Sequence, residues 1–320
     1  MKREQHIDSR SVSIVFWGTP EFAIPALQEL VAHKYTLVAV VTNPDEPAGR
    51  NQILTPPPVK VCAETNNIAV LQPVTLKNAE IKLPNADVFV VAAYGKIIPK
   101  EMLAMPKYGS LNIHPSLLPR WRGPSPIQYA ILSGDAETGV SIMQIDELMD
   151  HGPVIAQVAV SIGSHSTYST LHDTLSKKGA ELLIGVLPDW INGNKKGAMQ
   201  DDIKATYSKM LKKDDARIDW SKNADAIERM VRALNPKPGV WTIWPGEKIC
   251  RVRIIDAEIE NEEPPYGSPG YVWQNEKKEL FVKTGKRSIR IKTLTIEGKK
   301  AMDARSFAHG HGAVIGSTFI

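Results

Sequence analysis

The first half of the chain alternates between short apolar runs and segments in which apolar residues recur at helical spacing. The apolar, β-branched runs predict strands at Val12–Trp17, Leu37–Val41, Asp87–Ala93, Ser110–Ile113 and Val140–Ile145. Helical spacing predicts helices at Glu21–Leu30, Ser125–Leu132 and Thr167–Trp190. Repeated strand–helix units, with strands that are apolar on both faces, are typical of a doubly wound, mostly parallel α/β sheet.

The pattern changes from about Tyr207. One helix is predicted at Asn223–Leu234, and short strand-like stretches follow it, separated by turns that contain Gly, Pro or charges. These stretches are Trp241–Trp244, Lys248–Ile255, Gly270–Gln274, Leu280–Thr284 and Ile289–Ile296. They predict a small, OB-like β-barrel. We therefore divide the chain into a tail (1–10), an α/β domain (11–192), a linker (193–207) and a β-barrel domain (208–320).

Composition agrees with two globular domains and excludes several other classes of protein. Hydrophobic residues make up 42% and charged residues 23% of the 320 residues, which excludes disorder and coiled coil. No apolar run approaches the roughly 20 residues that span a bilayer, and no apolar core of a signal peptide follows the basic N-terminus. We expect a cytoplasmic protein without membrane association.

The charge is distributed unevenly along the chain. Residues 208–320 hold 21 Lys and Arg against 15 Asp and Glu, whereas residues 1–207 hold 18 against 20. Between Lys277 and Lys300 there are nine basic and two acidic residues. This asymmetry favours a polyanion as partner of the second half, and a solvated basic surface without a partner is the alternative.

The segment Asn43–Pro58 is a long connection that carries five prolines. Long loops in compact domains are often functional, and a rigid surface loop is the alternative. The turn after the first strand, Gly18–Glu21, lacks the G-x-G-x-x-G pattern, which argues against a nicotinamide cofactor. We also find no Walker motif and no His/Cys cluster, and we therefore expect no metal.

The residue types that suit acyl chemistry gather in the segment Ser110–Gly123. Asn112 and His114 are two residues apart near the carboxyl end of a predicted strand, so both side chains point to the same side. Open α/β sheets bind ligands at that end. An amide N–H there can bind a developing oxyanion while the histidine moves a proton, although a structural histidine gives the same pattern.

A carboxylate that could orient this histidine lies downstream. The strand Val140–Ile145 is followed by Asp146, Glu147 and Asp150. Asp150 is the best placed of the three because it lies on a turn just before a glycine. The residue pattern alone leaves the choice open.

Several motifs resemble those of the folate-dependent formyltransferases. They are NIHPSLLPRWRG, GDAETGVSIMQID with MDHG, FWGTPEFA and AAYGKIIP in the first half of the chain. PAGR, KKDDARIDW, RALNPKPGVWT and IEGKKAMDARSF extend the resemblance into the second half, where it is specific to the methionyl-tRNA branch of that family. The resemblance covers residues 11–317.

The resemblance implies formyl transfer from 10-formyltetrahydrofolate, used as a cosubstrate, to methionyl initiator tRNA. It makes Asn112, His114 and Asp150 the catalytic residues. It also implies a folate cleft that is lined by residues 89–97 and by the strand and turn of Val140–Asp150. The residues expected to line this cleft are Phe89, Val91, Ala93, Tyr94, Gly95, Ile97, Ser116, Leu117, Leu118, Pro119 and Ile145.

The expected contacts to tRNA lie in two places. The resemblance makes Arg50 in the Asn43–Pro58 loop a contact to the acceptor end. In the basic second half we expect Lys283, Lys286 and Arg287 to contact phosphates without reading bases.

The sequence departs from the family pattern at two positions. Asn51-Gln52 stands where basic residues often follow the loop arginine, and His151 adds a second titratable group beside Asp150. Three other functions remain as alternatives: a formyltransferase for a glycinamide nucleotide or amino sugar, a formyltetrahydrofolate hydrolase, and a non-catalytic RNA-binding module. We expect a monomer.

Overall fold

The computed structural model describes residues 8, 11–49, 52–76, 81–246, 249–262, 264 and 266–320. Arg50, Asn51, Lys248 and most of the predicted tail lie outside these residues. The chain forms two compact units. The first comprises residues 1–126, 137–161 and 172–208, and the second comprises residues 127–136, 162–171 and 209–320.

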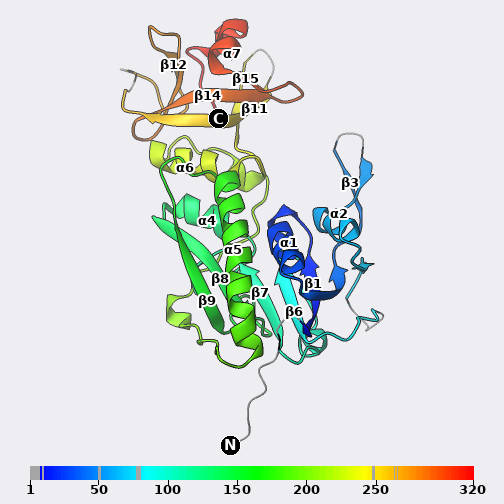
Figure 1. Cartoon of the computed structure of the whole chain (residues 1–320). Coiled ribbons are helices and arrows are strands. Elements are labelled where there is room, and N and C mark those ends of the chain that lie inside the picture. The colour runs from blue at the N-terminus through cyan, green and yellow to red at the C-terminus, as the bar shows by residue number, and fades with distance from the viewer. Residues whose placement is uncertain are drawn as a thin grey trace, which may run out of the picture. The chain divides into compact units, whose positions relative to one another are not determined.

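The first unit contains a seven-stranded sheet in the order β5-β2-β1-β6-β7-β8-β9. Figure 1 labels β1, β6, β7, β8 and β9 of this sheet. The strands are β1 (Ser13–Gly18), β2 (Thr36–Val41), β5 (Val70–Leu71), β6 (Val88–Ala92), β7 (Ser110–His114), β8 (Glu137–Gln144) and β9 (Val154–Ser161). Pairing is parallel from β5 to β7, and β8 and β9 are antiparallel to their neighbours. The chain adds β2 on one side of β1 and later β6 on the other, so a topological switch point lies between β1 and β6.

Helices and a small hairpin lie between these strands or follow β9, and residues 127–133 and 168–171 within these helices belong to the second unit. The helices are η2 (Glu21–Ala23), α1 (Ile24–Ala32), α2 (Pro58–Thr65), α3 (Lys100–Leu103), α4 (Pro126–Ser133), α5 (Tyr168–Ile191) and η3 (Asp202–Lys204). The Asn43–Pro58 loop holds the two-stranded hairpin of β3 (Glu46–Ala48) and β4 (Ile53–Thr55). The hydrophobic pattern did not predict α2, α3, β5 or β9. β5 has two residues and α3 has four, which are too few to establish a period.

The central strands are buried on both faces. Residues 14–17 of β1 have no exposed surface. On one face, the ring of Trp17 lies 5.6 Å from that of Phe89 and 5.1 Å from that of Tyr94. α5 approaches the sheet so closely that a Cβ atom on Gly179 would lie 2.6 Å from Ile113 Cγ2. The sheet thus forms a rigid support for the side chains at its carboxyl edge.

The second unit is built on an antiparallel sheet in the order β10-β11-β14-β13-β12, with β15 paired to β14. Its elements are η4 (Asp214–Ala216), α6 (Ala224–Leu234), β10 (Trp241–Trp244), β11 (Cys250–Glu260), β12 (Val272–Gln274), β13 (Leu280–Lys283), β14 (Ser288–Ile296), β15 (Met302–Asp303), α7 (Ala304–Gly310) and η5 (Gly312–Val314). Ile227, Val231 and Leu234 form one buried stripe of α6. A mostly parallel α/β sheet followed by an antiparallel half-barrel confirms the predicted fold class.

Within the described part of the chain, no helix combines the length and the apolar character needed to cross a membrane.

Candidate active site

The polar residues singled out in the sequence lie at the carboxyl end of β7, next to the strands that flank the switch point. β7 pairs with β6, which in turn pairs with β1. Asn112 and His114 are the third and fifth residues of β7, so the pleat places both on one face of the sheet. Both side chains therefore lie at the end of the sheet where open α/β folds bind ligands.

The carboxylate of Asp150 brings the two side chains together. Asn112 Nδ2 donates to Asp150 Oδ1 over 3.4 Å, and His114 Nδ1 lies 3.5 Å from the same oxygen. On the other side of the ring, His114 Nε2 lies 3.1 Å from the carbonyl oxygen of Trp121. The two ring nitrogens thus face a carboxylate oxygen on one side and a backbone carbonyl oxygen on the other. With 4% of its surface exposed, the histidine has little freedom to turn away.

The backbone around the site is bent into an uncommon conformation. Asp150 has a φ of 50°, and Trp121 and Ala93 also lie in the left-handed region, with φ values of 59° and 47°. Non-glycine residues adopt this region rarely and at a cost, and such positions cluster at functional sites. The second carboxylate oxygen of Asp150 accepts a hydrogen bond of 2.8 Å from the backbone N–H of Gly123. This bond fixes the carboxylate beside His114.

The other two acids considered as candidates point to different partners. Asp146 Oδ2 lies 2.6 Å from His151 Nδ1, and Asp146 Oδ1 accepts from the backbone N–H of Leu148. Glu147 forms an ion pair with Lys100. In the described contacts, Asp150 is the acid that reaches Asn112 and His114.

Asp150 reaches the site by a route that the strand pattern did not indicate. β8 runs antiparallel to β7, so its last residue, Gln144, pairs with Leu111 near the start of β7 and not near its end. The loop after β8 carries Asp150 to Asn112 and His114. Within this loop a Cβ atom on Gly152 would lie 1.9 Å from the carbonyl oxygen of Gln144, so only glycine fits there.

The residues expected to bind folate differ in how much surface they expose. Phe89, Val91, Tyr94, Ser116 and Leu118 are buried; Leu117, Pro119 and Ile145 are half-buried; Ala93, Gly95 and Ile97 are exposed. Burial raises the pKa of Tyr94 to about 12. Ser116 Oγ donates to the carbonyl oxygen of Arg120 over 2.6 Å. The exposed members follow the end of β6.

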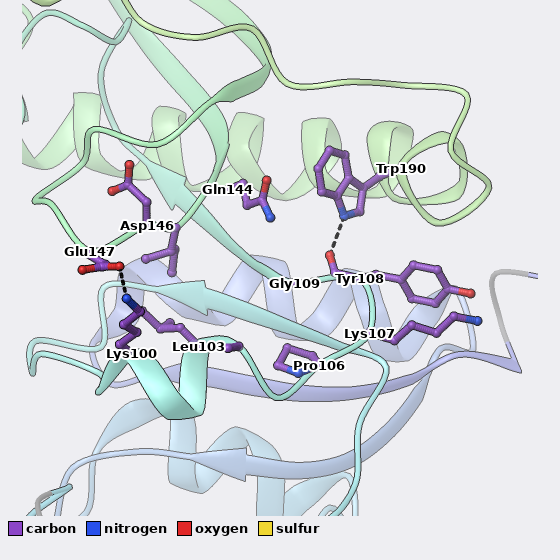
Figure 2. A pocket seen from close by; sticks show the side chains of 12 residues that line it. Lys100, Leu103, Pro106, Lys107, Tyr108, Gly109, Gln144, Asp146, Glu147 and Trp190 are labelled. Atoms are coloured by element: carbon purple, nitrogen blue, oxygen red, sulfur yellow. Dashed lines mark hydrogen bonds and ion pairs between the residues drawn. The ribbon is translucent and has the colours of Figure 1, made fainter.

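A pocket of about 560 Å³ lies between α3, the start of β7 and the end of β8 (Figure 2). Among the residues expected to bind folate, Ile145 is the one that lines it. The ion pair of Lys100 and Glu147 and the hydrogen bond from Trp190 Nε1 to the carbonyl oxygen of Tyr108 are both drawn in Figure 2. No motif predicted this pocket, because its walls come from segments far apart in the chain.

The second unit holds the three basic residues expected to contact tRNA. Lys283 ends β13 and is half-buried, and Lys286 is exposed on the turn to β14. The guanidinium of Arg287 pairs with Asp225 in the first turn of α6, and the pKa of that carboxyl is lowered chiefly by the hydrogen bond from Arg287. Arg287 therefore links the turn between β13 and β14 to α6.

The described side chains include no group of three or more His, Cys, Asp or Glu residues arranged to hold a metal ion.

Two family models match the chain. Residues 11–187 match the formyl transferases, and residues 210–312 match the C-terminal domain of formyl transferases. Among solved structures, the N-formyltransferase from Helicobacter canadensis, in complex with folinic acid and dTDP-3-aminofucose, is 21% identical with a TM-score of 0.64 and covers 88% of this chain and 98% of that chain. HypX from Aquifex aeolicus, in complex with tetrahydrofolic acid, is 17% identical with a TM-score of 0.62. The match covers 93% of this chain and 47% of the HypX chain. These two structures share the fold.

Curated relatives are more similar in sequence. The methionyl-tRNA formyltransferase of Coxiella burnetii is 42% identical over 308 residues, which are 94% of this chain and 96% of the relative. The methionyl-tRNA formyltransferase of a Geobacillus species is 41% identical over 315 residues, and the match covers 94% of this chain and 95% of the relative. With both family models matched in order and relatives at this identity along nearly its whole length, the chain belongs to the methionyl-tRNA formyltransferase family.

Proposed function

We propose that the chain transfers the formyl group of 10-formyltetrahydrofolate to the α-amino group of methionine on initiator tRNA. The carboxylate of Asp150, within reach of both Asn112 and His114, is the observation that carries this proposal. The relatives that align along the chain carry the same activity in their names. We place the reaction in the cytoplasm and propose that the chain acts as a monomer.

Asn112 and His114 stabilise the negative oxygen that forms when the amine attacks the formyl carbon. The bond from Asn112 to Asp150 is long at 3.4 Å, so the amide N–H can turn to an incoming oxyanion at little cost. One such donor is worth about 2.7–4 kcal/mol in the transition state. A doubly protonated His114 adds positive charge on the same face of the strand.

Asp150 orients the imidazole and accepts the proton that leaves the amine. When the tetrahedral intermediate collapses, the bond between the formyl carbon and N10 of the folate breaks, and N10 takes up a proton as tetrahydrofolate leaves. An α-amine titrates near pH 7.7–8.0, so a large fraction is already neutral in the cell and needs modest help from a base. Asp150 Oδ1 faces Asn112 and His114, whereas Oδ2 is held by the N–H of Gly123. The carboxylate thus keeps one oxygen directed at the reacting groups.

We assign tRNA binding to the basic second unit and to Arg50. Lys286 supports this assignment because it is exposed on a hairpin whose backbone is held in place: Gly285 N–H donates to the carbonyl oxygen of Lys222. A charge on a fixed turn can meet a phosphate with a small loss of conformational entropy. Arg50 would position the acceptor end.

His151 stabilises the loop that carries Asp150 through contacts on the other side of that loop. Its Nδ1 lies 2.6 Å from Asp146, and its Nε2 lies 3.5 Å from Asp202. The hydrogen bond with Asp146 is the main reason why the pKa of His151 is raised above 6.5. Positive charge on this ring therefore stabilises the folded loop.

We predict that Asn112→Ala, His114→Ala and Asp150→Asn each lower the turnover number at least ~10²-fold, because each removes a group that acts in the transition state. The assay is transfer of labelled formyl from 10-formyltetrahydrofolate to methionyl initiator tRNA.

Glu147→Gln is the matched control for Asp150→Asn, because Glu147 is exposed and pairs with Lys100, and its turnover should stay close to that of the wild type. An inactive Glu147→Gln variant beside an active Asp150→Asn variant would reverse the assignment of the acid.

Replacing Lys283 and Lys286 together by Ala should weaken tRNA binding and flatten its dependence on salt. The slope of log K against log salt should fall by up to about 0.9 for each duplex phosphate that the protein no longer neutralises. Lys177→Ala with Lys178→Ala, two exposed lysines on α5, is the control of equal charge. An equal effect of both pairs would mean that net charge, and not this hairpin, determines binding.

Stability should depend on pH through His151. Because its folded pKa is raised, its contribution is fully present below about pH 6.5 and is lost as the pH rises through the folded value. The Tm difference between wild type and His151→Asn should therefore be larger at about pH 5.5 than at about pH 8.5. His165→Asn, at an exposed histidine of the second unit, is the control. A difference that grows with pH would contradict the assignment.

A further inference from the structure

Gln200 contacts the loop of Asp150 from the segment that follows α5. Its Nε2 donates to the backbone carbonyl oxygen of Asp150 over 2.9 Å and to that of Gly152 over 2.8 Å. One carboxamide thus uses both of its N–H groups on the two carbonyls that flank residue 151. These two bonds fix the positions of the two carbonyls relative to each other. They therefore also fix the conformation of the turn.

The other end of the Gln200 amide is held by a buried arginine. Gln200 Oε1 accepts from Arg122 Nε over 3.0 Å, so the orientation of the amide is defined. Arg122 is 2% exposed, and its Nη2 donates to Asp202 over 2.8 Å. Burying a guanidinium is costly unless it is paired and hydrogen-bonded, so these acceptors fix the arginine as well.

The same stretch of chain holds the carboxylate and the backbone of Asp150. Arg122 directs Gln200 to the carbonyl of Asp150, and the next residue, Gly123, donates its N–H to Asp150 Oδ2 over 2.8 Å. Asp150 has a φ of 50°, a conformation that is unfavourable for a non-glycine residue and persists only where its surroundings hold it. Gln200 is the side chain that meets this strained peptide directly.

We propose that Gln200 is a positioning residue for Asp150, holding the turn so that the carboxylate faces Asn112 and His114. This inference rests on the proposed function, since it takes Asp150 as the catalytic acid. It makes residues 198–207, which belong to the predicted linker (193–207), part of the catalytic unit. The segment is anchored at both sides of Gln200, by pairing of Ala198 with Val154 and of Tyr207 with Arg122.

The test compares two variants that remove the donors in different ways. Gln200→Ala removes the whole amide, whereas Gln200→Glu keeps its shape and loses both N–H donors at neutral pH. We expect both to lower kcat about 10- to 100-fold, as a small misplacement of a catalytic group does, with KM for folate and for tRNA changed by less than about twofold. Asn192→Ala, which removes an amide-to-carbonyl bond at the end of α5, is the control and should keep wild-type kcat.

A double-mutant cycle with Asp150→Asn separates positioning from general support of the fold. If Gln200 acts through Asp150, Gln200→Ala should change the single-turnover rate of Asp150→Asn by less than about twofold. An additive loss in the double variant would overturn the proposal, as would wild-type kcat in Gln200→Ala or a change confined to KM. Wild-type protein that fails to formylate methionyl-tRNA would instead contradict the proposed function, so the two failures are distinguishable.

Discussion

The proposed active site of the first unit depends on holding one carboxylate beside an amide and an imidazole. Asp150 Oδ1 meets Asn112 and His114, and Asp150 Oδ2 meets the N–H of Gly123. Asn112 and His114 stand on a central strand that is buried on both sides, so they cannot move to find the acid. The acid must be brought to them, and much of the local structure does this.

The conformation of the local backbone follows from this need to bring Asp150 to Asn112 and His114. Asp150 takes a left-handed conformation, and Gly152 must lack a side chain because the loop passes so close to the carbonyl of Gln144. Hydrogen bonds from Gly123 and Gln200 offset the cost of this conformation. A strained turn held by polar contacts provides a preorganised site, which is what electrostatic stabilisation of a transition state requires.

The sequence predicted the parts of this site that depend on local pattern. Asn112 and His114 could be found because strand ends and period-2 spacing are visible in the chain. The turn before a glycine favoured Asp150 over Asp146 and Glu147, and the family resemblance was needed to choose it, since β8 runs antiparallel and a loop determines which acid reaches the histidine. Gln200 could not be found, because it lies 50 residues from Asp150 and acts through backbone carbonyls that carry no sequence signal. The pairing of Arg287 with Asp225 likewise joins two segments that no periodicity connects.

We propose that this site moves a formyl group to an amine on tRNA and not to water or to a sugar. The most direct measurement follows labelled formyl from 10-formyltetrahydrofolate in a single turnover, with and without methionyl initiator tRNA. We predict that the label appears as an acid-stable amide on the methionine, and only when charged tRNA is present. Release of the label as formate at the same rate with or without tRNA, or transfer to an amino sugar in preference to methionyl-tRNA, would contradict the account.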